Sequence, residues 1–164
     1  MKRVFTLIIL GIFLGYTSCN SGSGNRKSSV GYLTVTRVVD GDTFWAADGS
    51  EKGLNIRLIG VDTPESRNTG RKVVGYFGAE AKVFTSQLLS GKKVRLEYDV
   101  DSFDQYGRTL AYVYLEDGTF VNAELMKQGY AMVMTYPPNV KYADLFLKLQ
   151  QEARENNRGL WAHK

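Results

Sequence analysis

Cysteine and histidine are almost absent from this sequence, whose 164 residues include one of each, Cys19 and His163. Zinc sites draw most of their ligands from these two residue types, so the composition argues against zinc chemistry. His163 is next to the last residue, and we expect it to lie in an exposed tail. Internal repeats are also lacking. A hydrophobic content of 43% in a chain of this length allows one ordinary domain.

A strong charge of either sign is lacking too. The chain has a formal net charge of +4, and without residues 1–18 it has 19 basic and 17 acidic residues, a net charge of +2. So small an excess does not create a basic field that would attract polyanions by itself. Any anion recognition must therefore come from individually placed residues.

No apolar run is long enough to span a bilayer comfortably. The longest, "VFTLIILGIFLGY" at residues 4–16, follows Lys2 and Arg3 and has the length of the apolar region of a signal peptide. "YTSC" comes next and places small residues before Cys19. This start resembles a bacterial lipoprotein signal, which implies that Cys19 is lipidated and becomes the mature N-terminus. The alternative is a plain secretory signal with an incidental cysteine.

A polar segment follows Cys19 and precedes the folded domain. "NSGSGNRKSS" lacks apolar periodicity and has the composition of a flexible tether. We therefore expect a signal peptide at residues 1–18, a tether at 19–29 and one folded domain at 30–164. The expected location is the bacterial cell envelope, where the protein is lipid-anchored or secreted.

The folded part alternates strand-like and helix-like segments. Five segments are rich in Val, Ile, Tyr and Thr and are separated by turns, which predicts strands at 32–39, 42–47, 54–61, 92–100 and 109–115. Three segments with helical spacing end at or before a glycine, which predicts helices at 77–90, 120–129 and 142–159. In so short a chain this order favours an α+β fold with a five-stranded OB-type β-barrel and three helices.

Acidic residues recur at the ends of the predicted strands. In "VVDGDTF", Asp40 and Asp42 stand two apart and should project to one side, and Asp62 and Glu65 follow the third strand. A hairpin turn accounts for Asp40 and Gly41 but not for the other acids. Neither "DGDTFWAADG" nor "DVDSFDQYG" has an oxygen ligand at the fifth position or glycine at the sixth, which excludes an EF-hand. The acids therefore indicate a cluster assembled from separate strand ends.

Arg57 lies within the apolar run "IRLIGV" of the third predicted strand. An unpaired buried charge costs several kcal/mol, roughly the whole stability margin of a domain, so something anionic must meet it. Carboxylates together with arginines suggest a divalent cation and guanidinium groups that share an anionic substrate, for which a phosphate fits best. Hard oxygen ligands favour Ca²⁺. In "DTPE", Pro64 favours an extended Thr63 and so sets the offset of Glu65 from Asp62.

Six motifs, in order, resemble the staphylococcal nuclease (thermonuclease) family across residues 32–161: "VVDGDTF", "IRLIGVDTPE", "YFGAEAKVF", "DQYGRTLAYVY", "VNAELMKQGYA" and "NRGLW". The resemblance implies an OB-type barrel with three helices. It also implies a Ca²⁺-dependent endonuclease that hydrolyses DNA and RNA to 3′-phosphorylated products, and we expect it to act as a monomer.

The resemblance also implies roles for individual residues. Asp42 and Asp62 match the family's calcium carboxylates, and Thr63 matches the residue that offers its backbone carbonyl. The catalytic residues implied are Arg57, Glu65 and Arg108, with Asp40 near the metal but not bound to it. Glu65 is a general base or a group that orients water. Tyr106 and Tyr136 match positions that contact the 5′-phosphate or stack on a base.

Each of these assignments has a structural alternative. "YGR" around Arg108 is typical of a turn, and single tyrosines in barrel loops are often packing residues. Residues 66–76, "SRNTGRKVVGY", suit a lid over a polyanion or a connector. For the whole chain, the alternatives are a nucleic-acid-binding module of the same fold with weak catalysis, and an envelope lipoprotein with a structural role. The full set of acids and arginines argues against both.

Overall fold

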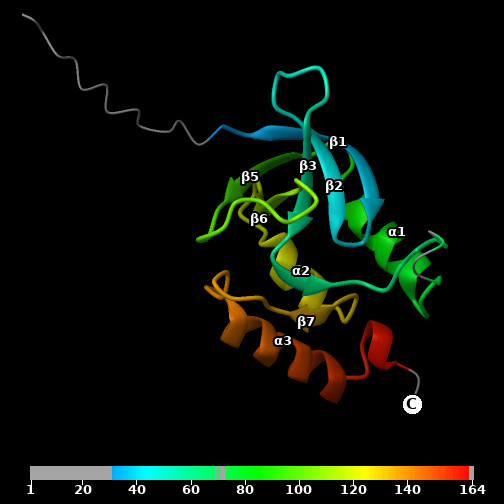
Figure 1. Ribbon diagram of the computed structural model, residues 1–164. Coiled ribbons are helices and arrows are strands. Elements are labelled where there is room, and N and C mark those ends of the chain that lie inside the picture. Colours follow the sequence, from blue (N-terminus) through cyan, green and yellow to red (C-terminus); the bar gives the residue numbers. More distant parts are fainter. Residues whose placement is uncertain (1–30, 69, 71–72, 163–164) are drawn as a thin grey trace, which may run out of the picture.

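Five of the strands form a closed barrel in the computed structural model, which describes residues 31–68, 70 and 73–162 (Figure 1). The barrel strands are β1 (Leu33–Asp40), β2 (Thr43–Ala47), β3 (Leu54–Leu58), β5 (Lys93–Glu97) and β6 (Thr109–Leu115). They are hydrogen-bonded in the order β1-β2-β3-β6-β5, and β1 pairs with β5 to close the ring. The predicted OB-type barrel with three helices is confirmed.

Alternation along the strands builds the interior of the barrel. On β2, Phe44 and Ala46 are fully buried, while Trp45 between them lies on the outer face. Ile56 of β3, Val94 of β5 and Val113 of β6 are also fully buried. One continuous apolar cluster therefore fills the barrel and extends to the helices.

Three α-helices cover the barrel: α1 (Gly78–Leu89), α2 (Val121–Lys127) and α3 (Ala143–Glu155). A short 3₁₀-helix, Gly159–Trp161, follows them. Helix α1 packs beside β1, and α2 lies between the barrel and α3 (Figure 1). Phe146 of α3 is fully buried in the common core. Within the described residues, no helix combines the length and the apolar character needed to cross a bilayer.

The third predicted strand is wrong in one respect, because it is broken rather than continuous over residues 54–61. β3 ends at Leu58, and a separate strand, β4 (Gly60–Asp62), pairs with β7 (Met132–Met134), which the sequence did not predict. At the break Gly60 has a φ of 78°, a left-handed conformation that favours glycine. This bend carries the chain out of the barrel and towards α3.

The predicted signal peptide and tether, together with Cys19 and His163, lie outside the described residues. The proposed lid at residues 66–76 is described only in part, because residues 69, 71 and 72 are not covered.

Candidate active site

A cleft of about 980 Å³ opens beside the ends of β2 and β3. Its walls come from the β1–β2 turn, from β3 and β4, and from two loops around residues 101–108 and 134–139. Most of the residues that the sequence singled out line this cleft: Asp40, Asp42, Arg57, Asp62, Glu65, Tyr106, Arg108 and Tyr136. Thr63 is buried directly behind it.

Asp42 is fixed by the tight turn between β1 and β2. Asp40 pairs with Thr43 across the hairpin, so Gly41 and Asp42 form its tip. The Thr43 hydroxyl donates to Asp42 Oδ1 at 2.9 Å, and the Thr63 N–H donates to Asp42 Oδ2 at 3.0 Å. A Cβ on Gly41 would lie 2.6 Å from Thr63 Oγ1, so glycine is needed for this close approach. The turn therefore holds the nearly buried Asp42 carboxylate against the segment after β4.

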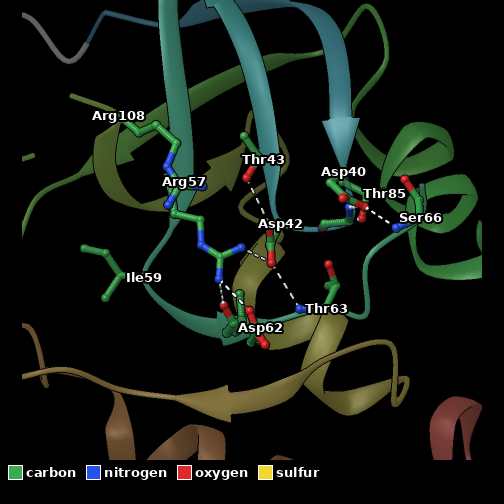
Figure 2. Close-up of polar contacts among 12 residues, drawn as sticks. Asp40, Asp42, Thr43, Arg57, Ile59, Asp62, Thr63, Ser66, Thr85 and Arg108 are labelled. Atoms are coloured by element: carbon green, nitrogen blue, oxygen red, sulfur yellow. Dashed lines mark hydrogen bonds and ion pairs between the residues drawn. The ribbon is translucent and has the colours of Figure 1, made fainter. Parts of the chain in front are cut away.

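Arg57 reaches from β3 between two carboxylates (Figure 2). Its Nη1 forms an ion pair with Asp42 Oδ2, and its Nη2 donates to Asp62 Oδ1 at 2.8 Å. Nη2 also donates to the Val61 carbonyl at 3.2 Å. The predicted anionic partners of Arg57 are thus two acids that come from different strand ends.

Burial shapes the electrostatics of Arg57. The arginine side chain is 16% exposed, and burial lowers the pKa of Arg57, while the hydrogen bond to Asp62 opposes that shift. A guanidinium keeps its proton in proteins, so the group remains a cation. Two carboxylates compensate its charge and leave the cluster with a formal charge of −1, which favours a further cation beside the two acids.

Asp104 holds Arg108, which lies in the loop just before β6. Asp104 Oδ2 accepts from Arg108 Nε at 2.6 Å, and Oδ1 accepts from the backbone N–H groups of Tyr106 and Arg108, each at 2.9 Å. Only the Nε edge of the guanidinium is used in this contact. Its two Nη groups remain available to a phosphate, which a bidentate donor recognises well.

Glu65 and Asp40 lie together near the start of α1. The Glu65 carbonyl accepts from Gly75 N at 3.0 Å, and Gly78 packs so closely on that carbonyl that a Cβ would clash. Asp40 Oδ1 accepts from the N–H groups of Gly41 at 2.9 Å and Ser66 at 3.3 Å. Burial raises the pKa of Asp40, and the adjacent Glu65 adds to the increase. The start of α1 therefore helps to set the position of the Glu65 backbone.

The donor set fits a hard cation. Two carboxylates, Asp42 and Asp62, meet at one guanidinium, and Thr63 follows Asp62 directly. Thr63 Oγ1 is buried and has no hydrogen-bond partner in the described part of the chain, which leaves an unsatisfied polar group on the residue that donates its N–H to Asp42. The described residues hold no cluster of three or more His, Cys, Asp and Glu with metal-binding geometry. Two carboxylates supplemented by a backbone carbonyl and water match calcium better than a metal that needs a full side-chain cage.

Tyr106 and Tyr136 stand at the rim of the cleft, and each is 70% exposed. Such exposure is not typical of packing residues, which were the structural alternative. Phe103, 65% exposed, also lines the cleft and was not singled out from the sequence. Asn139 was missed as well. Its Nδ2 donates to the Asp101 carbonyl and its Oδ1 accepts from Asp101 N, each at 2.8 Å, which joins the two loops of the cleft.

Comparison with known proteins agrees with this geometry. Residues 55–163 match the family model described as staphylococcal nuclease homologue. The chain is 42% identical to a thermonuclease of Staphylococcus intermedius, over 98% of this chain and 99% of that protein. It is 39% identical to a thermonuclease of Staphylococcus hyicus, over 98% and 94% of the two chains. Endonuclease YncB of Bacillus subtilis is 39% identical, over 85% of this chain and 65% of its own length.

The family model covers well over half of the chain, and the two thermonucleases match nearly all of it. The family model begins after β1 and β2, whereas the matches to the two thermonucleases extend over nearly the whole chain. This chain belongs to the staphylococcal nuclease family.

Proposed function

We propose that this nuclease of the staphylococcal nuclease family is a calcium-dependent endonuclease that hydrolyses DNA and RNA to 3′-phosphorylated products. The observation that carries the proposal is the single cleft that Asp42, Arg57, Asp62, Glu65 and Arg108 line. Thermonucleases and an endonuclease among its relatives support it.

The two arginines suit the charge that develops on a phosphodiester during hydrolysis. Water attacks phosphorus, the P–O5′ bond breaks, and the O5′ atom leaves as an alcohol once it gains a proton. The negative charge on the phosphoryl oxygens must be stabilised during this step. Arg57 comes from β3 and Arg108 from the loop before β6, and both line the cleft, so they can bind different phosphate oxygens. A lysine could not reproduce such paired N–H donation.

Glu65 is the residue proposed to handle the attacking water. It lies in the same cleft as both arginines, and its carboxylate can accept a proton from water or orient the water by hydrogen bonding. Asp40 stands beside it, and its raised pKa reflects that proximity as well as burial. We assign Asp40 a supporting role because backbone N–H groups already occupy its Oδ1.

Calcium would be held by Asp42, Asp62 and the backbone carbonyl of Thr63. When bound, the ion would polarise a phosphate oxygen and add positive charge to the site. Arg57 already contacts both acids, so it is placed to share them with a cation and to turn part of its hydrogen bonding to a phosphate.

The test is cleavage of a short DNA and a short RNA by the purified protein with Ca²⁺, with Mg²⁺ and with a chelator. Ca²⁺ tolerates irregular oxygen ligands, whereas Mg²⁺ demands tight octahedral geometry, so we expect turnover in Ca²⁺ and little in Mg²⁺. End-group analysis should detect 3′-phosphates. Equal rates with either ion, or full activity in chelator, would contradict the calcium proposal.

We further propose that the protein is a lipoprotein of the bacterial cell envelope, anchored through Cys19. The support is the sequence alone: a basic start, a short apolar run and small residues before the only cysteine. Residues 1–30 lie outside the described part of the structure.

A further inference from the structure

Trp45 is a large aromatic residue on the outer face of the barrel, and the proposed reaction does not use it. Its neighbours on β2, Phe44 and Ala46, point into the core, so the Trp45 ring lies on the opposite face. A hollow of about 290 Å³ surrounds it, lined by Thr36, Arg37, Trp45 and Lys52. We call these four residues the Trp45 patch.

Two cations flank the ring of Trp45. The Arg37 guanidinium carbon lies 5.8 Å and the Lys52 Nζ 6.0 Å from the ring centroid. Across the described residues neither cation forms an ion pair with a carboxylate. In the neighbouring hairpin loop, Asp48 Oδ1 is taken by the N–H and hydroxyl of Ser50. Both positive charges are thus free to meet an anion.

The Trp45 patch lies on the same face of the β2–β3 pair as the residues of the active-site cleft. Trp45 lies opposite Asn55 of β3 and opposite Arg37 of β1. Asn55 also lines the cleft, and Arg57 follows it two residues along the same strand. Residues two apart on a strand share a face and lie about 7 Å from each other. A chain leaving Arg57 can therefore reach Trp45 without crossing the barrel.

We infer that the Trp45 patch is a second nucleotide-binding subsite, at which one base of a single strand stacks on Trp45 while Arg37 and Lys52 bind the adjoining phosphates. An aromatic platform between unpaired cations is the arrangement that binds single strands without sequence preference. The inference rests on the proposed function, because it extends the substrate path away from the cleft. It predicts that the nuclease binds long single strands more tightly than dinucleotides.

The test measures binding of fluorescein-labelled oligothymidylates of two and eight residues by anisotropy, in chelator so that no cleavage occurs. Trp45→Ala should weaken binding of the eight-residue strand by about 10-fold, the scale of one lost stacking contact, and leave the dinucleotide unaffected. Trp45→Phe should restore most of the affinity. Arg37→Ala and Lys52→Ala should each lower the slope of log affinity against log salt by about 0.7.

Arg95→Ala is the matched control, because Arg95 also lies over an aromatic ring, that of Tyr114 at 4.3 Å, but on another side of the barrel. The inference is overturned if Trp45→Ala binds the long strand like the wild type, or if Arg95→Ala weakens binding as much as Arg37→Ala. It is also overturned if a polyaspartate peptide competes for the Trp45 patch as well as the oligonucleotide does.

Cleavage of the same oligonucleotides in Ca²⁺ separates the two proposals. A wild-type protein that binds with the expected length dependence but does not cleave contradicts the proposed function alone. A protein that cleaves, but whose KM for the long strand is unchanged in Trp45→Ala, contradicts the subsite alone.

Discussion

Arg57 carries a formal charge into an apolar strand, and its two carboxylate partners compensate that charge. Removing one partner of a buried ion pair typically costs more than the pair itself contributes, because a charge is then left uncompensated. The opening turn of β2 and the end of β4 each contribute one acid. Position in the fold, and not the identity of Arg57 alone, therefore decides whether the residue is tolerated.

Replacing Glu65 by glutamine preserves size and much of the hydrogen bonding but removes the basic oxygen. If Glu65 handles the attacking water, single-turnover cleavage should slow by about 10²-fold or more. Calorimetric binding of a nucleoside bisphosphate in Ca²⁺ should persist, because Asp42, Asp62 and the arginines are intact. Glu116→Gln, at an exposed carboxylate that is not among the cleft-lining residues, is the control. Near-normal cleavage by a folded Glu65→Gln protein would refute the assignment.

Asp104 positions Arg108. Titration of the Asp104 carboxyl group should make the stability of the fold depend on pH. Burial alone would raise the pKa of Asp104, but hydrogen bonds from the Arg108 N–H groups outweigh it, and the pKa lies below 3.8. The unfolded chain therefore takes up the proton at higher pH than the folded one. The stability that this carboxylate adds is present above pH 3.8 and is lost as the pH falls through the folded-state pKa.

Asp104→Asn places an amide N–H₂ against the Arg108 Nε–H and should lower the free energy of unfolding at pH 7 by about 1 kcal/mol. The difference from the wild type should shrink as the pH falls below 3.8. Urea unfolding of both proteins at pH 7, 5 and 3 measures it. A gap of constant size at all three pH values would show that the charge of Asp104 contributes nothing.

The sequence identified some of the residues that line the cleft and missed others. Asp42, Asp62 and Glu65 were marked by strand ends and the DTPE motif, and Arg57 by its charge in an apolar strand, whereas Arg108 was assigned only through the family resemblance. Asp104 was missed, although its signal was present: an aspartate that begins a turn often accepts from the N–H two residues on, as it does here from Tyr106. Phe103 and Asn139 had no local signal, since their roles depend on two loops that meet only in the fold.

At the scale of elements, the junction between β3 and β4 positions the acids of the site. The Leu58 N–H donates to the Asp42 carbonyl at 3.0 Å, and the Ile59 carbonyl accepts from buried Asn122 of α2 at 2.9 Å. After Gly60 the chain departs from the barrel, so that Asp62 faces back towards Arg57. The break in the strand thus brings the second carboxylate to the cleft.

The break was not predicted, although Gly60 within the run "LNIRLIGV" is the kind of residue that marks a bend in a strand. Strand β7 has only three residues, Met132–Met134, too few for periodicity to be detected. Tertiary contacts with α3 stabilise β7, because Val133 N donates a hydrogen bond to Gln150 Oε1 of α3 at 2.8 Å. The five barrel strands and three helices were predictable because each is long enough to show its own period.

Gly60→Ala tests the junction. Its φ of 78° is left-handed, and a Cβ there would lie 2.6 Å from the buried Phe146 ring. Backbone strain and overpacking together should lower the free energy of unfolding by about 2–4 kcal/mol. Gly49→Ala is the matched control, with a φ of 90° and no atom within 4 Å of the added Cβ, so it should lose only about 1 kcal/mol. Equal losses in urea unfolding would exclude a packing role for Gly60.

At the scale of the whole molecule, we propose that the N-terminal segment determines where the nuclease acts. The proposed lipid on Cys19 would hold the domain at a membrane, and the tether of about ten residues would let it reach nucleic acid nearby. Cys19 precedes in sequence every residue that lines the cleft. We therefore expect location and catalysis to be separable by mutation.

Cys19→Ser should release the protein from membranes or leave it unprocessed, because the only thiol available for lipidation is lost. Membrane fractionation with detection of the protein, and mass spectrometry of its N-terminus, measure the outcome. The nuclease activity of the purified variant should equal that of the wild type. Continued partition with membranes at the wild-type level would rule out the lipid anchor.

The parallel pairing of β3 with β6 affects when the active site forms during folding. Ile56 pairs with Thr109 and Arg57 with Leu110, so the two proposed catalytic arginines reach one cleft only after some fifty intervening residues have been placed. Such long-range pairing forms late, because its loop-closure entropy must be overcome first. A nascent or unfolded chain then has no assembled site. Activity begins only when the barrel closes.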